Sequence, residues 1–146
     1  SEHDAMLVRV GGSIQSGGYW QVNEKLKREV NLKQMKNIPE EEMPYIYSAA
    51  DVFIAPQAYN EGFTYPPLEA MACGTPLMIS NMKIFERWAM TIPSNPKGLS
   101  ETILKILSNS ALSQKMSKKS LQGAKHFSLE KEAQKTYEVY ERASKQ

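Results

Sequence analysis

Apolar runs and amphipathic segments alternate through the first two-thirds of the chain. Short apolar runs that end at glycine, proline or a polar residue predict β-strands, and a continuous run suits a strand that is buried on both faces. The expected strands cover 6–12, 31–35, 51–56, 76–80 and 91–93. The clearest of them reads DVFIAP and is stopped by a proline.

Segments with apolar residues three or four positions apart predict helices between and after these strands. The expected helices cover 19–30, 39–50, 66–74, 83–90, 96–107, 111–125 and 129–143. Asn95 and Ser128 stand just before two of them, where a side-chain oxygen caps the first turn. Gly74 stands where the third helix is expected to stop.

The alternation of strands and helices predicts βα units joined into a parallel sheet by right-handed crossovers. The expected fold class is therefore α/β, with a Rossmann-like parallel sheet flanked by helices. Ligands of such sheets bind outside the carboxyl ends of the strands. We therefore expect binding residues in the loops that follow Val10, Ala55 and Ser80.

Composition narrows the function classes. A chain of 146 residues suits one domain over 1–146, with its last helices at 96–143. A formal net charge of +2 gives no strong attraction to nucleic acid, and no apolar run approaches the roughly 20 residues of a membrane span. The single Cys73 excludes an internal disulfide, and His3 and His126 lack nearby ligand partners, so no metal site is expected.

The basic residues avoid the middle of the chain. Between Asn37 and Met82 there is no lysine or arginine. The acids of this stretch are Glu40, Glu41, Glu42, Asp51, Glu61 and Glu69. An anionic ligand held here would need positive charge from another segment; the alternative is chance combined with a solvated acidic helix start.

The stretch NEGFTYPPLEAMACGTP, at 60–76, places two acids around a glycine and a helix start. Glu61 follows a strand, Gly62 permits close approach of the backbone to a ligand, and Glu69 falls in the first turn of the expected helix. The free amides of a helix N-terminus suit a phosphate. A nucleotide sugar fits this layout, with hydroxyls for the acids and a diphosphate for the amides.

A structural role explains the same residues as well. Glu69 would stabilise the helix start by about 0.3–1 kcal/mol. Glu61 would be an exposed loop acid, and Phe63 and Tyr65 would pack. Two acids eight positions apart are a weak signal without further evidence.

Several segments in order resemble one enzyme family. They are MLVRVGG, IPEEEMPYIYSAADVFIAP, EGFTYPPLEAMACGTPLMISN, NPKGLSETILKILSN and AKHFSLEKEAQKTYEVYE, and together they cover nearly the whole chain. They resemble the retaining glycosyltransferases of two-domain GT-B architecture, in the group often called family 4. The matching part is the C-terminal, donor-binding half.

The resemblance implies roles for named residues. Glu61 would lie against the transferred sugar as the catalytic residue. The backbone amides of Gly62, Phe63 and Thr64 would contact the sugar and diphosphate, and Glu69 would bind the ribose hydroxyls. Met35 or Lys36 would contact the nucleobase. Apart from the resemblance, Gly11 and Gly12 are expected to form the turn at the end of their strand, and contact of Gly12 with the donor is the alternative.

It also implies substrates and partners. The donor would be a UDP- or GDP-sugar, with no metal or other cofactor required, and the acceptor would be a glycan, a lipid or another hydroxyl compound. The acceptor would bind to an N-terminal GT-B domain of the enzyme or to a partner subunit. The single cysteine fits a reducing compartment, so a cytoplasmic enzyme is expected, and peripheral association of the full enzyme with the cytoplasmic face of a membrane stays open.

The sequence departs from the family pattern in three places. Thr64 and Tyr65 stand where relatives have small residues, which would narrow the sugar pocket. The segment at 86–93 is short. An earlier strand–helix unit, whose arginine and lysine pair with the diphosphate in relatives, is expected to be lacking.

Three alternatives remain open. The chain would be a non-catalytic module that docks a partner, or one subunit of a split glycosyltransferase. Another GT-B enzyme, such as a sugar-nucleotide epimerase or a glycogen synthase, shares the glutamate spacing. The last helix carries Ala133, Tyr137 and Tyr140 on one face, which would pack on the sheet, reach a second domain or promote self-association.

Overall fold

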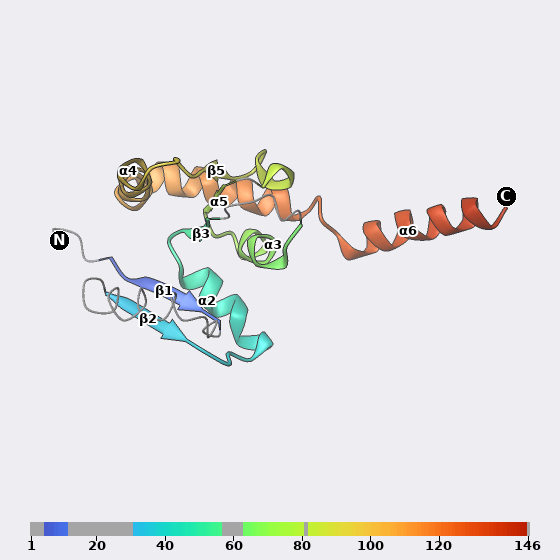
Figure 1. Ribbon diagram of the computed structural model, residues 1–146, viewed down its shortest axis with the longest axis horizontal. Helices are drawn as coiled ribbons and strands as arrows, with labels where there is room; N and C mark the ends of the chain where they lie inside the picture. The colour runs from blue at the N-terminus through green and yellow to red at the C-terminus, as the bar shows by residue number, and fades with distance from the viewer. Residues whose placement is uncertain (1–4, 12–30, 57–62, 81, 146) are drawn as a thin grey trace. The chain divides into compact units, whose positions relative to one another are not determined.

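The computed structural model describes residues 5–11, 31–56, 63–80 and 82–145 (Figure 1). The backbone forms two compact units, Ser1–Met43 and Pro44–Gln146. Each unit is described by itself below. The expectation of a single domain over 1–146 therefore stays a prediction.

The first unit contains two parallel strands. β1 (Leu7–Val10) pairs with β2 (Leu32–Met35) so that Leu7 lies opposite Leu32 and Val10 opposite Met35. Gly11 ends β1 at a φ of 117°, a backbone conformation that favours glycine. The strands expected at 6–12 and 31–35 are both confirmed. A short 3₁₀ helix, η1 (Glu40–Glu42), follows them, and the helix expected at 19–30 lies outside the described residues.

A three-stranded parallel sheet is the centre of the second unit. Its strands are β3 (Phe53–Ala55), β4 (Leu77–Ile79) and β5 (Met90–Thr91), with β4 in the middle. The helices are α2 (Met43–Ala49), α3 (Tyr65–Ala72), α4 (Pro96–Leu107), α5 (Ser110–Ala124) and α6 (Leu129–Ser144). The α/β class with a Rossmann-like parallel arrangement, predicted from the alternation of elements, is confirmed.

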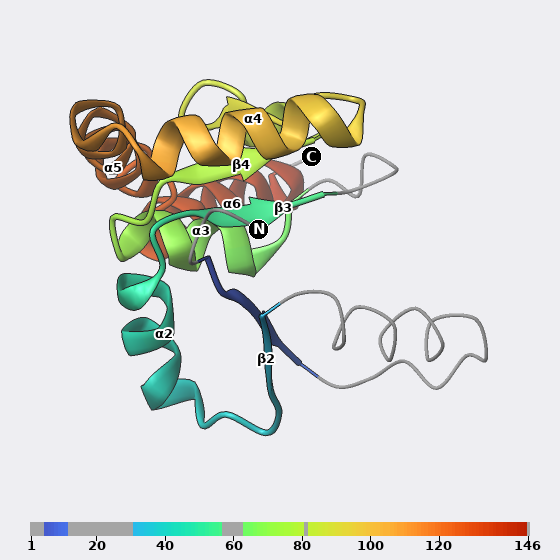
Figure 2. The ribbon, with the colours of Figure 1, turned by 90° about the vertical axis from the view of Figure 1, so that its left-hand side faces the viewer.

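The central strand is buried on both faces, as its unbroken apolar run predicts. Leu77 and Ile79 belong to one core cluster, and Met78, between them, belongs to the other. The first cluster also contains Met71 of α3, and the second contains Ile106 of α4. Figure 2 accordingly shows α3 and α4 on opposite sides of β3 and β4.

Side-chain caps fix the starts of the last three helices. Asn95 accepts a hydrogen bond from the Gly98 amide at 2.7 Å, and Ser128 accepts one from the Lys131 amide at 3.3 Å, so both predicted caps are confirmed. Asn109 caps α5 in the same way at 3.0 Å from the Leu112 amide. Asparagine before a helix is the usual sequence signal of such a cap, so Asn109 could have been predicted in the same way.

One predicted helix is much shorter than expected. The expected helix at 83–90 is reduced to the 3₁₀ helix η2 (Lys83–Phe85), and β5 begins at Met90. Met90 pairs with Met78 on β4, and Phe85 is fully buried. Pairing with the central strand therefore requires extended backbone where the local pattern favoured a helix.

The last helix does not pack on the sheet. No residue of α6 is buried, and Tyr137 and Tyr140 are 59% and 72% exposed. Of the expected roles for its apolar face, packing on the sheet is therefore wrong for the structure described. Contact with a second domain and self-association remain predictions.

Candidate functional site

The start of α3 brings together the described residues of the glutamate segment. Phe63 and Thr64 precede the helix, and Glu69 lies on it. Glu61, Gly62 and Gly12 lie outside the described residues. Met35 ends β2 in the first unit, where it is half-buried. Its contact with a nucleobase stays a prediction.

The N-terminus of α3 has fewer amide donors than an ordinary helix start. Thr64 is the extended N-cap residue, and Tyr65 begins the helix. The next two residues, Pro66 and Pro67, have no N–H. Thr64 and Tyr65 therefore carry the first-turn amides that have no partner within the helix, and an anion at this end would bind to these and to the preceding backbone.

Glu69 lies one residue deeper in α3 than predicted. The helix begins at Tyr65, not at Pro66, and has no acid in its first turn, so the expectation of a first-turn glutamate is wrong. The extended conformation of Thr64 allows Tyr65 to enter the helix before the proline pair. Glu69 is exposed, so its carboxylate is open to a ligand.

A buried tyrosine holds the Glu69 carboxylate. The Tyr47 hydroxyl, from α2, donates a hydrogen bond to Glu69 Oε2 at 2.8 Å. Tyr47 is only 6% exposed, and its ring packs edge-on against Phe53, with centroids 5.7 Å apart. The buried Thr75 hydroxyl also donates to the Tyr47 carbonyl oxygen at 2.7 Å. One oxygen of Glu69 is therefore held by a side chain that is itself fixed.

The protonation of Tyr47 keeps this hydrogen bond in place. Burial raises the pKa of the Tyr47 phenol well above its ordinary value, and the hydrogen bond to Glu69 and the negative charge of Glu69 raise this pKa further. Tyr47 therefore remains a donor across the physiological pH range. The sequence around Tyr47 does not predict this role, because nothing local reveals a partner 22 positions away.

An aromatic cluster anchors Phe63. Its ring lies 5.6 Å from the ring of Tyr65, 5.8 Å from Phe85 and 5.7 Å from Phe127, measured between centroids. The side chains of Phe63 and Tyr65 therefore pack, as the structural alternative proposed. The expected donor contacts of Phe63 and Thr64 involve their backbone amides and stay predictions.

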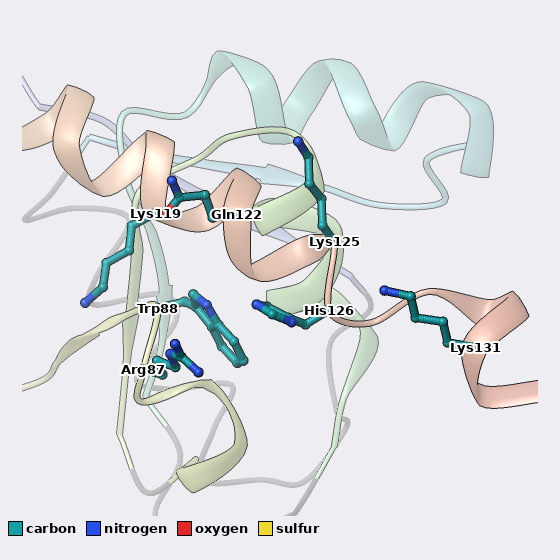
Figure 3. Close-up of a pocket in the computed structure, with 7 residues that line it drawn as sticks. All are labelled: Arg87, Trp88, Lys119, Gln122, Lys125, His126 and Lys131. Carbon is teal, nitrogen blue, oxygen red and sulfur yellow. The ribbon is translucent and has the colours of Figure 1, made fainter. Parts of the chain in front are cut away.

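A second feature of this unit was not anticipated from the sequence. A hollow of about 460 Å³ is lined by Arg87, Trp88, Lys119, Gln122, Lys125, His126 and Lys131 (Figure 3). Its basic residues come from separate segments, the turn after η2, α5 with the residues that follow it, and the start of α6. Their spacing in the sequence gives no signal of a shared site.

Among the described residues, no group of three or more His, Cys, Asp or Glu side chains is placed to hold a metal ion. Within the same part of the chain, no helix combines the length and the apolar character that crossing a bilayer requires.

A protein-family model matches most of this chain. The model described as "Glycosyl transferases group 1" matches residues 1–122. The chain belongs to this family. A curated relative, the O-antigen chain mannosyltransferase B of Escherichia coli, is 32% identical to this glycosyltransferase-family chain over 126 residues, which is 83% of the chain and 33% of the relative.

Solved structures show the same fold. A sucrose-phosphate synthase from Thermosynechococcus elongatus matches with a TM-score of 0.81 and 23% identity, over 94% of this family member and 38% of that chain. A glycosyltransferase from Rickettsia africae matches with a TM-score of 0.73 and 17% identity, over 95% and 40% of the two chains. The structural neighbours are GT-B glycosyltransferases, which confirms the predicted fold family. The chain thus spans between a third and two-fifths of the length of these relatives.

Proposed function

We propose that this chain is the donor-binding part of a retaining glycosyltransferase that moves a sugar from a nucleoside diphosphate sugar to a hydroxyl acceptor. Membership of the glycosyl transferases group 1 family supports the reaction class. The observation that carries the proposal is the exposed carboxylate of Glu69, which accepts a hydrogen bond from Tyr47. Glu69 lies on α3, whose first amides have no partner within the helix.

The Glu69 carboxylate suits the recognition of a sugar diol. Its Oε2 atom accepts from Tyr47 at 2.8 Å, which fixes the plane of the carboxylate. The other oxygen and the remaining lone pair of Oε2 can accept hydrogen bonds from two neighbouring hydroxyls. In the proposed complex these are the ribose hydroxyls of the donor. Because Tyr47 is already ordered, binding does not have to fix this acceptor.

The backbone before α3 suits the diphosphate. In the proposed complex the amides from Gly62 to Tyr65 donate to phosphate oxygens, and the positive end of the helix dipole favours the same charge. The proline pair supplies no further donors, and no lysine or arginine lies between Asn37 and Met82. Additional positive charge for the diphosphate is therefore expected from another segment or from a partner domain.

The proposed reaction breaks the bond between the anomeric carbon and the diphosphate oxygen. The acceptor oxygen forms the new bond on the same face of the sugar, and its proton goes to the leaving diphosphate. Glu61 is the proposed residue against the transferred sugar, where its charge would stabilise an oxocarbenium-like transition state. Fixed amide donors stabilise the leaving group, which is the main electrostatic contribution. The proposal requires no metal.

The rest of the machinery is proposed to lie outside this chain. The chain spans about a third of the length of its curated relative, which leaves room for an acceptor-binding domain or subunit. That relative is a mannosyltransferase by name, so mannose nucleotides are the first donors to test. The location proposed for the enzyme is the cytoplasm, including the cytoplasmic face of a membrane.

Calorimetry tests donor binding. UDP, GDP and their sugar conjugates are titrated into the folded chain and into Glu69→Ala, with Glu132→Ala, an exposed acid on α6, as the control. Because a charge-assisted contact to the ribose is lost, nucleotide affinity is expected to be about ten-fold weaker in Glu69→Ala. The affinity of Glu132→Ala is expected to equal that of wild type. Equal affinities for wild type and Glu69→Ala, or no nucleotide binding at millimolar concentration, would overturn the proposal.

One observation favours a second candidate function, a non-catalytic partner-docking module. The apolar face of α6 is exposed, with Tyr140 at 72% and Leu129 at 75%. A module of this kind would bind its partner without binding a nucleotide. The same titrations separate the two functions, because only the donor-binding part shows an affinity that depends on Glu69.

A further inference from the structure

The hollow beside Trp88 gathers positive charge. Four side chains that line it carry a positive charge, Arg87, Lys119, Lys125 and Lys131. The lining also includes Gln122, and none of the described side chains that line it is acidic. Like charges around one hollow repel each other, and an anion in the hollow relieves this repulsion.

The neighbouring acids on α6 are engaged with other partners. The Glu130 carboxylate accepts a hydrogen bond from the Ser128 hydroxyl, which lowers the pKa of Glu130. Glu132 pairs with Lys135 at 2.7 Å. Neither carboxylate lines the hollow, and Glu132 already pairs with a lysine of its own helix.

Packing fixes the aromatic wall of the hollow. Trp88 lies against Gly123, where an added Cβ would collide with the Trp88 ring and with the Met71 methyl group. The Trp88 ring also packs edge-on against Phe127, with centroids 5.4 Å apart, and lies 5.1 Å from the ring of His126. Figure 3 shows Trp88 and His126 side by side, with basic side chains around them.

Arg87 is positioned by the same wall. Its guanidinium carbon lies 5.8 Å from the Trp88 ring centroid, within the range of a cation–π interaction. A guanidinium placed this way keeps its N–H donors for a second partner, and planar Arg donors match phosphate oxygens in pairs. The lysines add charge, and Gln122 adds uncharged hydrogen-bonding capacity.

We propose that this hollow is a second anion site that binds a phosphate-bearing ligand. It shares no residue with the proposed donor site at Glu69 and the start of α3. At about 460 Å³, it has room for a phosphate group with a sugar or similar ring against Trp88. The phosphate belongs either to a free phosphorylated solute or to the headgroup of an anionic lipid, and these two sources present the same chemistry.

Charge reversal tests the site in the full chain. The double variant Lys125→Glu/Lys131→Glu removes two cations and adds two anions, and Lys118→Glu is the matched control because Lys118 is exposed on α5 but does not line the hollow. Circular dichroism confirms that each variant is folded. The probes are inorganic pyrophosphate, followed by calorimetry, and phosphatidylcholine vesicles with or without phosphatidylglycerol, followed by flotation.

The proposal predicts that wild type binds at least one anionic probe and that the double variant binds it about ten-fold more weakly or not at all, because charge-assisted contacts are lost. Lys118→Glu retains binding, and binding falls as salt concentration rises. Pyrophosphate binding identifies a free solute as the source, and flotation only with phosphatidylglycerol identifies a lipid headgroup.

Two results would overturn this proposal. One is the absence of binding to both anionic probes, and the other is equal weakening in the double variant and in Lys118→Glu. Glu69→Ala separates the two sites. It is expected to leave binding at the hollow unchanged even if nucleotide binding is lost, so failure of the proposed donor site does not decide this test.

Discussion

The pair of Tyr47 and Glu69 is the most specific residue-level feature of the structure. The two side chains come from different helices, are 22 positions apart and form a 2.8 Å hydrogen bond. One member is buried and the other is exposed. We interpret Tyr47 as a positioning residue that orients the carboxylate for a ligand and does not touch the ligand itself.

Replacing Tyr47 by phenylalanine tests this interpretation. Tyr47→Phe keeps the packed ring but removes the donor to Glu69. We expect the free energy of unfolding to fall by about 0.5–1.5 kcal/mol, the usual net value of one hydrogen bond, and nucleotide affinity to fall less than in Glu69→Ala. Denaturant unfolding and calorimetry measure the two effects.

The matched control for this variant is Tyr45→Phe. Tyr45 lies on the same helix but is 76% exposed. Its replacement is expected to leave both stability and nucleotide affinity unchanged. The positioning role would be wrong if Tyr47→Phe lost stability but bound nucleotide as tightly as the Tyr45→Phe control.

The raised pKa of Tyr47 predicts a pH dependence of stability. Burial is its main cause, followed by the hydrogen bond to Glu69. In the alkaline range the folded state therefore binds this proton more tightly than the unfolded state. The contribution to stability is complete below the ordinary tyrosine pKa of about 10 and is lost as pH rises toward the folded-state pKa.

Unfolding of wild type and Tyr47→Phe at a series of pH values checks this sign. The difference in free energy of unfolding between the two proteins is expected to be constant from neutral pH to about pH 10 and to shrink above it. Because the two proteins differ only at position 47, contributions from all other titrating groups cancel in this difference. A difference that grew with rising pH would contradict the assignment.

The close packing of α5 against Trp88 predicts that a larger residue at Gly123 destabilises the protein. At Gly123, even one added methyl group meets Met71 and Trp88. We expect Gly123→Ala to lower the free energy of unfolding by about 1–3 kcal/mol, despite the better helix propensity of alanine. Chemical denaturation measures this change, with Lys118→Ala as an exposed control on the same helix.

Elements with a strong local signal could be predicted from the sequence. The apolar run of β4 required burial on both faces, and the structure divides Leu77 and Met78 between two core clusters. Asn95 and Ser128 marked helix starts because capping depends on the next three residues only. These features need no information from distant segments.

The missed features depend on tertiary contacts. Met90 forms a strand because it pairs with Met78, whereas its own neighbours favoured a helix. The start of α3 at Tyr65 moved Glu69 out of the first turn. The hydrogen bond from Tyr47 to Glu69 and the lining of the basic hollow both bring together segments that lie far apart in the sequence, so no local pattern could reveal them. The resemblance indicated Glu69 itself, but not how it is held.

At the scale of the whole molecule, the chain is a family member that spans only part of its relatives. The exposed face of α6 adds little to the stability of this chain alone, since Tyr137 and Tyr140 are largely solvent-exposed. We expect Tyr137→Ser/Tyr140→Ser to change the free energy of unfolding by no more than about 0.5 kcal/mol, measured by chemical denaturation. A larger loss would show that α6 packs on the rest of the chain in solution.

The central claim is that the start of α3 and the Glu69 carboxylate hold a nucleoside diphosphate. The most direct measurement is a titration of the ¹⁵N-labelled chain with UDP and GDP, followed by the amide resonances of Phe63, Thr64, Tyr65 and Glu69. Pro66 and Pro67 give no amide signal, so these four resonances report on the proposed contacts. The account predicts saturable shifts at these amides that are strongly reduced in Glu69→Ala. Saturable shifts confined to other parts of the chain, with these four amides unmoved, would contradict it.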